Sequence, residues 1–362
     1  MHKLGISIYP EHSTKDRDDA YMRLASSYGF KRIFTCLLSV NQTKEKLVRE
    51  FSDFMNRAHE YGFEVSVDTN AEVFRLLDAT PTNLKPFADM GVDILRLDGH
   101  FDEFHDIAIT HNPYHIKIEF NGSSDATMDH LLKHGADPHN MMMCHNFYPQ
   151  RHTGLSWETF TTFNQKWKDL GLHTAAFVSS NNTNTYGPWP VYAGLPTCEI
   201  HRGLPIDVQA RHLLAYGLID DIFIGNCYAN EEELRALSQI DKNKITMKIE
   251  LEDDLTATEL EILFENIHSG RDDAPRDLLR SCISRDKYRM YPIAFRKYES
   301  AMLHRGDVVI INDNLPHYRG EFQIILHDIE NDGERNVVGR LKKDELLILE
   351  QLKTDHIFGF IR

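Results

Sequence analysis

Three carboxylates lie near the ends of short apolar segments in the first half of the chain. Asp68 ends VSVD, Asp98 ends ILRLD, and Glu119 lies in IKIEF. Alternate side chains of an extended strand point to opposite faces, so each acid faces away from its apolar neighbours. Two carboxyl groups in unlike surroundings can serve as general acid and general base. We expect two of the three to be catalytic, with Asp98 and Glu119 as the first choice because their strands are adjacent.

Two cations accompany these acids on the same predicted faces. Arg96 precedes Asp98 by two residues, and Lys117 precedes Glu119 in the same way. Because an unpaired buried charge costs several kcal/mol, we expect both cations to neutralise the carboxylates from a deeper layer. Crowding of the acids would raise the pKa of at least one of them, as an acid–base pair requires.

The elements that must position these residues are repeated βα units. Roughly the first 230 residues alternate short apolar segments with amphipathic, helix-like stretches, which is typical of a parallel sheet. An open doubly wound sheet is the alternative, but it usually carries a Gly-rich phosphate-binding turn after its first strand, and here that strand runs into Tyr9-Pro10-Glu11. We predict a TIM (β/α)8 barrel with strands at Leu4–Pro10, Arg32–Leu38, Glu64–Thr69, Ile94–Asp98, Ile116–Asn121, Met141–Asn146, Thr174–Ser179 and Asp221–Asn226.

Active sites of such barrels lie at the carboxyl ends of the strands. Polar side chains there suit a ligand with many hydroxyl groups. Some have an equally good structural interpretation, since Glu11 can help to start a helix and His145 can be a core histidine. The expected substrate-binding residues are Glu11, Asn70, Arg96, Asn121, His145, Asn146, Tyr148, Ser179, Asn181 and Asn226.

The pattern changes near residue 238. Strand-like segments such as ITMKIELE and GEFQIILHDI alternate with turns rich in Gly, Asn and Asp, which is typical of hairpins. We therefore predict a catalytic barrel over residues 1–238 and a small β-rich domain over residues 239–362, with a helix at Leu341–Leu352.

Composition excludes several classes of function. The formal charge of −15 argues against nucleic acid or an anionic membrane as partner. The N-terminus lacks the apolar core of a signal peptide, and the five cysteines form no CxxC pair, so we expect buried thiols in a reducing, cytoplasmic setting. HxH and HExxH spacings are missing from the predicted strand ends, so we expect no metal and no cofactor. A homo-oligomer is left open.

Several motifs together resemble one bacterial family. GISIYPE, RLDG, IEFNGS, CHNFYP and GLPTCEIHRGLP are similar to the 6-phospho-N-acetylmuramidases of glycoside hydrolase family 170, once catalogued as "outer surface protein". The resemblance covers essentially the whole chain and implies a TIM barrel followed by a cyclophilin-like β-barrel. It also implies hydrolysis of the β-glycosidic bond of N-acetylmuramic acid 6-phosphate–N-acetylglucosamine, a small phosphorylated amino-sugar disaccharide, in peptidoglycan recycling.

That substrate carries a phosphate, so the site needs a cation. A guanidinium binds phosphate in bidentate fashion, and we expect Arg202 to do so, with Arg151 as second choice. The sequence leaves open a retaining, an inverting or a substrate-assisted mechanism. It also leaves open a sugar-phosphate lyase or isomerase and a non-catalytic sugar-phosphate-binding protein.

Overall fold

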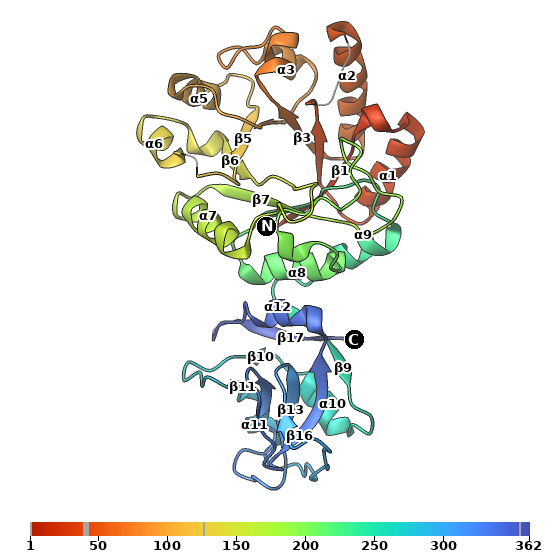
Figure 1. Cartoon of the computed structure of the whole chain (residues 1–362), viewed down its shortest axis with the longest axis vertical. Helices are drawn as coiled ribbons and strands as arrows, with labels where there is room; N and C mark the ends of the chain where they lie inside the picture. The colour runs from red at the N-terminus through yellow and green to blue at the C-terminus, as the bar shows by residue number, and fades with distance from the viewer. Residues whose placement is uncertain (1, 39–42, 126, 355) are drawn as a thin grey trace. The chain divides into compact units, whose positions relative to one another are not determined.

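Eight parallel strands close into a barrel in the first part of the chain (Figure 1). Their order around the barrel is their order in the sequence, and β1 pairs with β8 to close it. The predicted TIM barrel is therefore confirmed, and every predicted strand overlaps an observed one. The strands are β1 (Lys3–Ser7), β2 (Arg32–Cys36), β3 (Glu64–Thr69), β4 (Ile94–Leu97), β5 (Lys117–Asn121), β6 (Met141–Cys144), β7 (His173–Val178) and β8 (Asp221–Ile224).

The computed structural model describes residues 2–38, 43–125, 127–354 and 356–362. Within them the chain divides into two compact units. The first comprises residues 1–213 and 217–239, and the second comprises residues 214–216 and 240–362. No helix among the described residues has the length and apolar character needed to cross a membrane.

Helices surround the barrel, and α2 shows how an apolar face turns a helix toward the strands. In α2, the buried side chains Leu47, Phe51, Phe54, Met55 and Ala58 recur at helical spacing and so form one stripe against the strands. The helices of this unit are α1 (Lys15–Ser27), α2 (Lys44–Glu60), α3 (Ala71–Leu76), α4 (Lys85–Asp89), α5 (Glu103–Thr110), α6 (Met128–Lys133), α7 (Trp157–Asp169), α8 (Ile206–Tyr216) and α9 (Glu231–Ser238), with 3-10 turns η1 (Pro10–His12), η2 (Pro138–Asn140) and η3 (Glu199–His201).

Aromatic rings fill part of the barrel interior. The centroid of the Phe177 ring lies 5.0 Å from that of Phe34 and 5.5 Å from that of Phe223. The centroid of the Phe223 ring also lies 4.9 Å from the guanidinium carbon of Arg32. These rings occupy the interior between the Arg32 side chain and the carboxyl ends of the strands.

The second unit is built on a mixed, seven-stranded sheet with the order β10-β17-β9-β16-β13-β14-β11, beside a two-stranded sheet of β12 and β15. Its core contains Leu303, Val309, Ile325 and Val337. A β-rich second part is therefore confirmed, while its cyclophilin-like character stays a prediction. Its strands are β9 (Ile245–Leu251), β10 (His268–Ser269), β11 (Leu278–Ser281), β12 (Met302–Leu303), β13 (Asp307–Ile311), β14 (Phe322–Ile325), β15 (Ile329–Glu330), β16 (Arg335–Leu341) and β17 (Ile357–Ile361).

The helix predicted at Leu341–Leu352 is shorter than expected. Leu341 ends a strand, and only a short helical stretch follows it. Pairing of β16 with β9 and β13 takes Leu341 into the sheet, and the helical part of the predicted span is divided between a 3-10 turn and a four-residue α-helix. The helices of this unit are α10 (Ala257–Phe264), α11 (Ile283–Tyr288), α12 (Leu346–Leu349) and the 3-10 turn η4 (Lys343–Glu345).

Candidate functional site

A cavity of about 290 Å³ opens at the carboxyl ends of the barrel strands. It combines two acids and an arginine with aromatic side chains, a mixture that suits a sugar with polar edges and apolar faces. We call it the carboxylate cavity. Its lining comprises Phe34, Leu38, Asp68, Arg96, Asp98, His145, Asn146, Phe147, Pro149, Phe177 and Trp189.

Arg96 joins the two acids of this cavity. Its Nη1 forms an ion pair with Oδ1 of Asp68 and lies 3.6 Å from Oδ1 of Asp98. Its Nη2 donates a hydrogen bond to the side-chain oxygen of Asn146. The side chains of Arg96 and Asp68 are 3% and 6% exposed, whereas that of Asp98 is 48% exposed. One guanidinium thus holds a buried acid and an open acid on neighbouring strands.

The two acids lie in different surroundings, and the pKa of Asp68 reflects this. Burial raises this pKa, the charge of Arg96 lowers it, and the charge of Asp98 raises it again, with a result of about 6. Burial dominates because the charged form loses its hydration. Asp68 can therefore carry a proton near neutral pH.

Glu119, one of the two first-choice catalytic acids, lies outside the residues that line the cavity. Its side chain is fully buried, and its Oε1 is 2.5 Å from Nη2 of Arg32. Arg32 also forms an ion pair with Asp221, and it donates a hydrogen bond of 2.5 Å to Ser66 Oγ. This closed cluster lies in the barrel interior and offers no opening for a substrate.

The expected counter-charge of Glu119 was Lys117, and this prediction is wrong. Lys117 is exposed at the first position of β5. Arg32, at the first position of β2, supplies the charge instead. A strand-initial lysine keeps its ammonium in water by extending past the strand end. Arg32 was missed because the sequence does not show which distant strands face it across the barrel.

His145 lines the cavity but is held as a structural residue. Its Nδ1 lies 3.1 Å from Ser123 Oγ and its Nε2 lies 3.3 Å from Asn164 Oδ1. Burial lowers the pKa of His145 to about 4, so the ring stays neutral at physiological pH. Ser123 Oγ also accepts the backbone N–H of Asn146. The histidine therefore helps to position Asn146 beside Arg96.

Several predicted substrate-binding residues have local structural roles. The Asn70 side chain caps α3 by accepting the backbone N–H groups of Glu72 and Val73. The Asn121 side chain accepts the backbone N–H of Ser123. Amide oxygens often serve turns and helix starts in this way. These two residues lie at strand ends for local reasons.

Glu11 acts on Cys36, a neighbour of the buried acid Asp68. Burial, the charge of Asp68 and, more weakly, the charge of Glu11 raise the pKa of the Cys36 thiol. The Sγ atom of Cys36 lies 3.8 Å from Oδ2 of Asp68. Glu11 therefore lies within electrostatic reach of Cys36 and stays a candidate for substrate contact.

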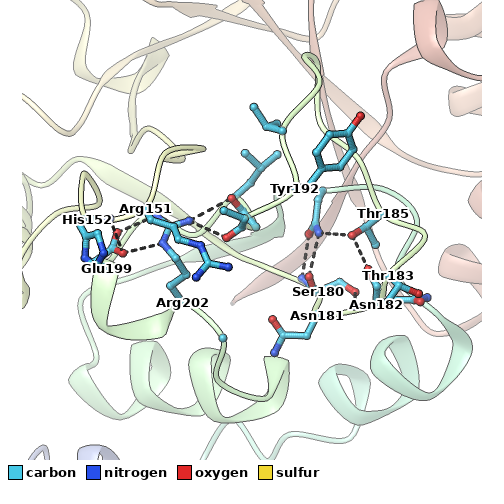
Figure 2. A pocket seen from close by; sticks show the side chains of 16 residues that line it. Arg151, His152, Ser180, Asn181, Asn182, Thr183, Thr185, Tyr192, Glu199 and Arg202 are labelled. Atoms are coloured by element: carbon cyan, nitrogen blue, oxygen red, sulfur yellow. Dashed lines mark hydrogen bonds and ion pairs between the residues drawn. The ribbon is translucent and has the colours of Figure 1, made fainter.

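A second cavity, of about 570 Å³, lies beyond the ends of β7 and β8. Figure 2 shows Arg151, His152, Glu199 and Arg202 on one side and Ser180, Asn182, Thr183 and Thr185 on the other. Asn181 and Asn226, two of the predicted binding residues, also line it. Ser179, also predicted to bind substrate, does not line this cavity. Its Oγ accepts a hydrogen bond from the backbone N–H of Leu195.

Arg202, the preferred phosphate ligand, is already fully engaged. It forms a bidentate ion pair with Glu199, with both N–O distances at 2.7 Å. Its remaining donors bind the backbone oxygens of Tyr148, Gln150, Ala193 and Gly194. Arg202 therefore links the loop that follows β6 to the loop that follows β7. Tyr148, a predicted substrate-binding residue, contributes a backbone oxygen to this link.

Arg151 is the more available cation of this cavity. It is exposed, and among the described residues no ion pair engages its guanidinium. Pro149 lines the carboxylate cavity, and Arg151 lines the second cavity two residues further along the same loop. The two cavities are thus linked through the segment that follows β6.

The described residues include one group with metal-binding spacing, Glu103, His130 and His134. All three are exposed; Glu103 lies on α5, His130 on α6, and His134 directly follows α6. None of them lines either cavity. His130 Nε2 lies 2.9 Å from Glu103 Oε1, so a simple ion pair accounts for the arrangement.

The comparisons with known proteins agree with this architecture. A family model described as 6-phospho-N-acetylmuramidase, N-terminal, matches residues 4–239, and its C-terminal counterpart matches residues 245–361. The chain belongs to the 6-phospho-N-acetylmuramidase family. In this family member, the motif RLDG supplies Arg96 and Asp98, and CHNFYP supplies four residues of the carboxylate cavity. No curated protein matches the chain.

Two solved structures resemble this family member over nearly their whole length. A crystal structure of an uncharacterized B. cereus protein is 41% identical, with a TM-score of 0.92, and the match covers 100% of this chain and 99% of that one. A conserved Enterococcus faecalis protein with an unknown function is 26% identical, with a TM-score of 0.71 and coverage of 99% and 96%. Both of these proteins therefore share the two-unit architecture of this chain.

Proposed function

We propose that this protein hydrolyses the β-glycosidic bond of N-acetylmuramic acid 6-phosphate–N-acetylglucosamine, as a step in the reuse of cell-wall material. The family membership supports the substrate class. The observation that carries the chemistry is the pair Asp68 and Asp98, which share one arginine at an open cavity. Two acids in unlike surroundings are what glycosidic bond cleavage requires.

Asp68 is the general acid in this proposal. A pKa of about 6 leaves an appreciable fraction of this carboxyl protonated near neutral pH, so it can protonate the glycosidic oxygen as the bond breaks. The proton passes to the departing sugar hydroxyl, and Asp68 becomes a carboxylate. Arg96 then stabilises the new negative charge.

Asp98 acts on the other side of the reaction. Its half-exposed carboxylate either attacks the anomeric carbon or removes a proton from the attacking water. Arg96 orients Asp98 as well, because the same Nη1 lies near both acids. Glu119 takes no direct part, and the catalytic pair proposed here is Asp68 and Asp98.

The substrate phosphate belongs to the second cavity in this proposal. Loops after the last two strands of TIM barrels often bind phosphate, and this cavity lies among those loops. Arg151 supplies the cation, with hydroxyl and amide groups such as those of Thr183 and Asn181 as further donors. Arg202 holds the backbone of Ala193 and Tyr148 in the loops that surround this cavity.

The test is incubation of the pure protein with the disaccharide phosphate in H2-18O, followed by mass analysis of the products. Hydrolysis predicts free N-acetylglucosamine and N-acetylmuramic acid 6-phosphate with one added 18O. Products without added oxygen would indicate a lyase or isomerase, and binding without turnover would indicate a sensor. Either result contradicts the proposal. An unchanged rate after EDTA treatment would exclude a dissociable catalytic metal.

A further inference from the structure

Aromatic side chains form a shelf beside the carboxylate cavity. Tyr186, Trp189 and Tyr192, here called the aromatic shelf, line a shallow cavity of about 400 Å³ on the long loop after β7. Tyr192 is 82% exposed and Trp189 is 38% exposed. Large aromatic side chains left open at the mouth of a barrel are suited to stacking on the apolar face of a sugar ring.

The shelf is continuous with the carboxylate cavity. Trp189 lines both of them. Its ring centroid lies 6.2 Å from that of Phe147, another residue of the carboxylate cavity. A ligand that fills the carboxylate cavity and extends past Trp189 therefore enters the shelf next.

Contacts with the rest of the barrel hold the shelf loop. His12 Nε2 lies 2.7 Å from the backbone oxygen of Pro188. The backbone of Tyr186 pairs with that of Cys227 through two hydrogen bonds of 2.6 and 3.0 Å. The shelf is thus preformed, which lowers the entropic cost of binding a ring there.

The charge of the shelf distinguishes it from its neighbour. Its lining contains His12 but no carboxylate and no arginine or lysine, whereas Arg151, Glu199 and Arg202 line the second cavity. An anionic phosphate is therefore better accommodated in the second cavity. An uncharged sugar ring is better accommodated on the shelf.

We propose that the aromatic shelf binds the sugar on the leaving-group side of the scissile bond, an uncharged N-acetylhexosamine; this inference rests on the function proposed above. The anomeric carbon and C5, which carries the phosphorylated C6, flank the ring oxygen of the cleaved sugar. The second sugar, attached at the anomeric carbon, and the phosphate, attached through C5 and C6, therefore project from neighbouring positions of the same ring. The shelf and the second cavity are neighbours too, because Thr183, Thr185 and Tyr192 line both.

The deciding experiment compares two substrates with the same cleaved sugar. One is the disaccharide phosphate, and the other is the β-fluoride of N-acetylmuramic acid 6-phosphate, which has no second ring. Tyr192→Ala should lower the ratio of kcat/KM for the disaccharide to kcat/KM for the fluoride by about tenfold. An unchanged ratio would overturn the inference. Tyr114→Ala is the matched control, since Tyr114 is 38% exposed and precedes β5 at the other end of the barrel.

A binding measurement keeps this inference separate from the proposed function. The methyl β-glycoside of N-acetylglucosamine should change the tryptophan fluorescence saturably, because Trp189 lines the shelf, whereas the other two tryptophans, Trp157 and Trp167, lie on α7 and do not line it. Tyr192→Ala should weaken that binding, and Trp189→Phe should abolish the signal. If the wild type cleaves neither substrate, the proposed function fails, and this titration still decides the shelf. A wild type without a saturable signal would contradict the inference.

Discussion

Two arginine–carboxylate clusters in the same barrel have nearly the same composition and opposite surroundings. The first, here called the lower cluster, consists of Arg32, Glu119 and Asp221. Arg32 lies between the two acids, and all three side chains are at most 1% exposed. In the upper cluster, Arg96 lies between Asp68 and Asp98, and Asp98 is 48% exposed at a cavity. Access of a substrate to the acids, rather than the type of residue, distinguishes the structural ion pairs of the lower cluster from the candidate catalytic pair of the upper one.

The pKa values of one acid in each cluster, Asp221 and Asp68, move in opposite directions. Burial raises the pKa of Asp221, but its hydrogen bond with His173 and the charge of Arg32 outweigh burial and hold this pKa below its usual value. Burial dominates at Asp68 and raises its pKa to about 6. Asp221 of the lower cluster is therefore held in its charged form, while Asp68 of the upper cluster can exchange a proton.

The largest expected effect is on bond cleavage in the upper cluster. Asp68→Asn removes the proton donor, so kcat for the disaccharide phosphate should fall by about a thousandfold. Hydrolysis of the β-fluoride should be affected far less, because fluoride departs without protonation. Steady-state kinetics on both substrates check this, and equal losses would remove Asp68 from the role of acid.

The next effect is on the stability of the lower cluster. Glu119→Gln breaks a fully buried pair with Arg32 and should lower the free energy of unfolding of the barrel by about 3 kcal/mol. Urea titration followed by circular dichroism measures this. The control is Glu64→Gln, whose partner Lys3 and own side chain are half exposed, and it should change stability by less than about 1 kcal/mol. Equal stabilities of the two variants would contradict the assigned role of Glu119.

A smaller effect should separate the two arginines of the second cavity. Arg151→Ala should raise KM for the 6-phosphorylated disaccharide by about tenfold, the value of one charge-assisted contact, with little change for the dephosphorylated form. Arg202→Ala should impair both substrates together, because it releases the loop held by Glu199, Ala193 and Tyr148. Equal effects of Arg151→Ala on the two substrates would remove it from the phosphate site.

The smallest expected effect is on the pH dependence of kcat/KM. Because Asp68 must be protonated to act, kcat/KM for the disaccharide should fall as pH rises above about 6, while the β-fluoride should show no such decline. Asp98→Asn removes a negative neighbour, so the pKa of Asp68 should decrease in that variant. Infrared titration of the carboxyl band measures this pKa, and an increase would contradict the arrangement of charges.

The sequence predicts the barrel well because each strand is a local signal. Alternation of polar and apolar residues places Asp68 and Arg96 correctly in the interior. Partners across the barrel are not local, and Arg32 meets Glu119 only after the barrel closes. For the same reason Glu119 is indistinguishable from Asp98 in the sequence.

Loop contacts limit the prediction in another way. The engagement of Arg202 depends on the backbone conformation of two loops, which residue types do not specify. Asn70 and Asn121 look like binding residues because amides serve helix caps and substrates equally well.

The most direct test of the account compares kcat for the disaccharide phosphate in folded Asp98→Asn and folded Glu119→Gln, measured below the unfolding temperature of both variants. The account predicts a loss of about a thousandfold for Asp98→Asn and a loss of less than about tenfold for Glu119→Gln. A Glu119→Gln variant that is folded and inactive, beside an active Asp98→Asn variant, would contradict the assignment of chemistry to the upper cluster.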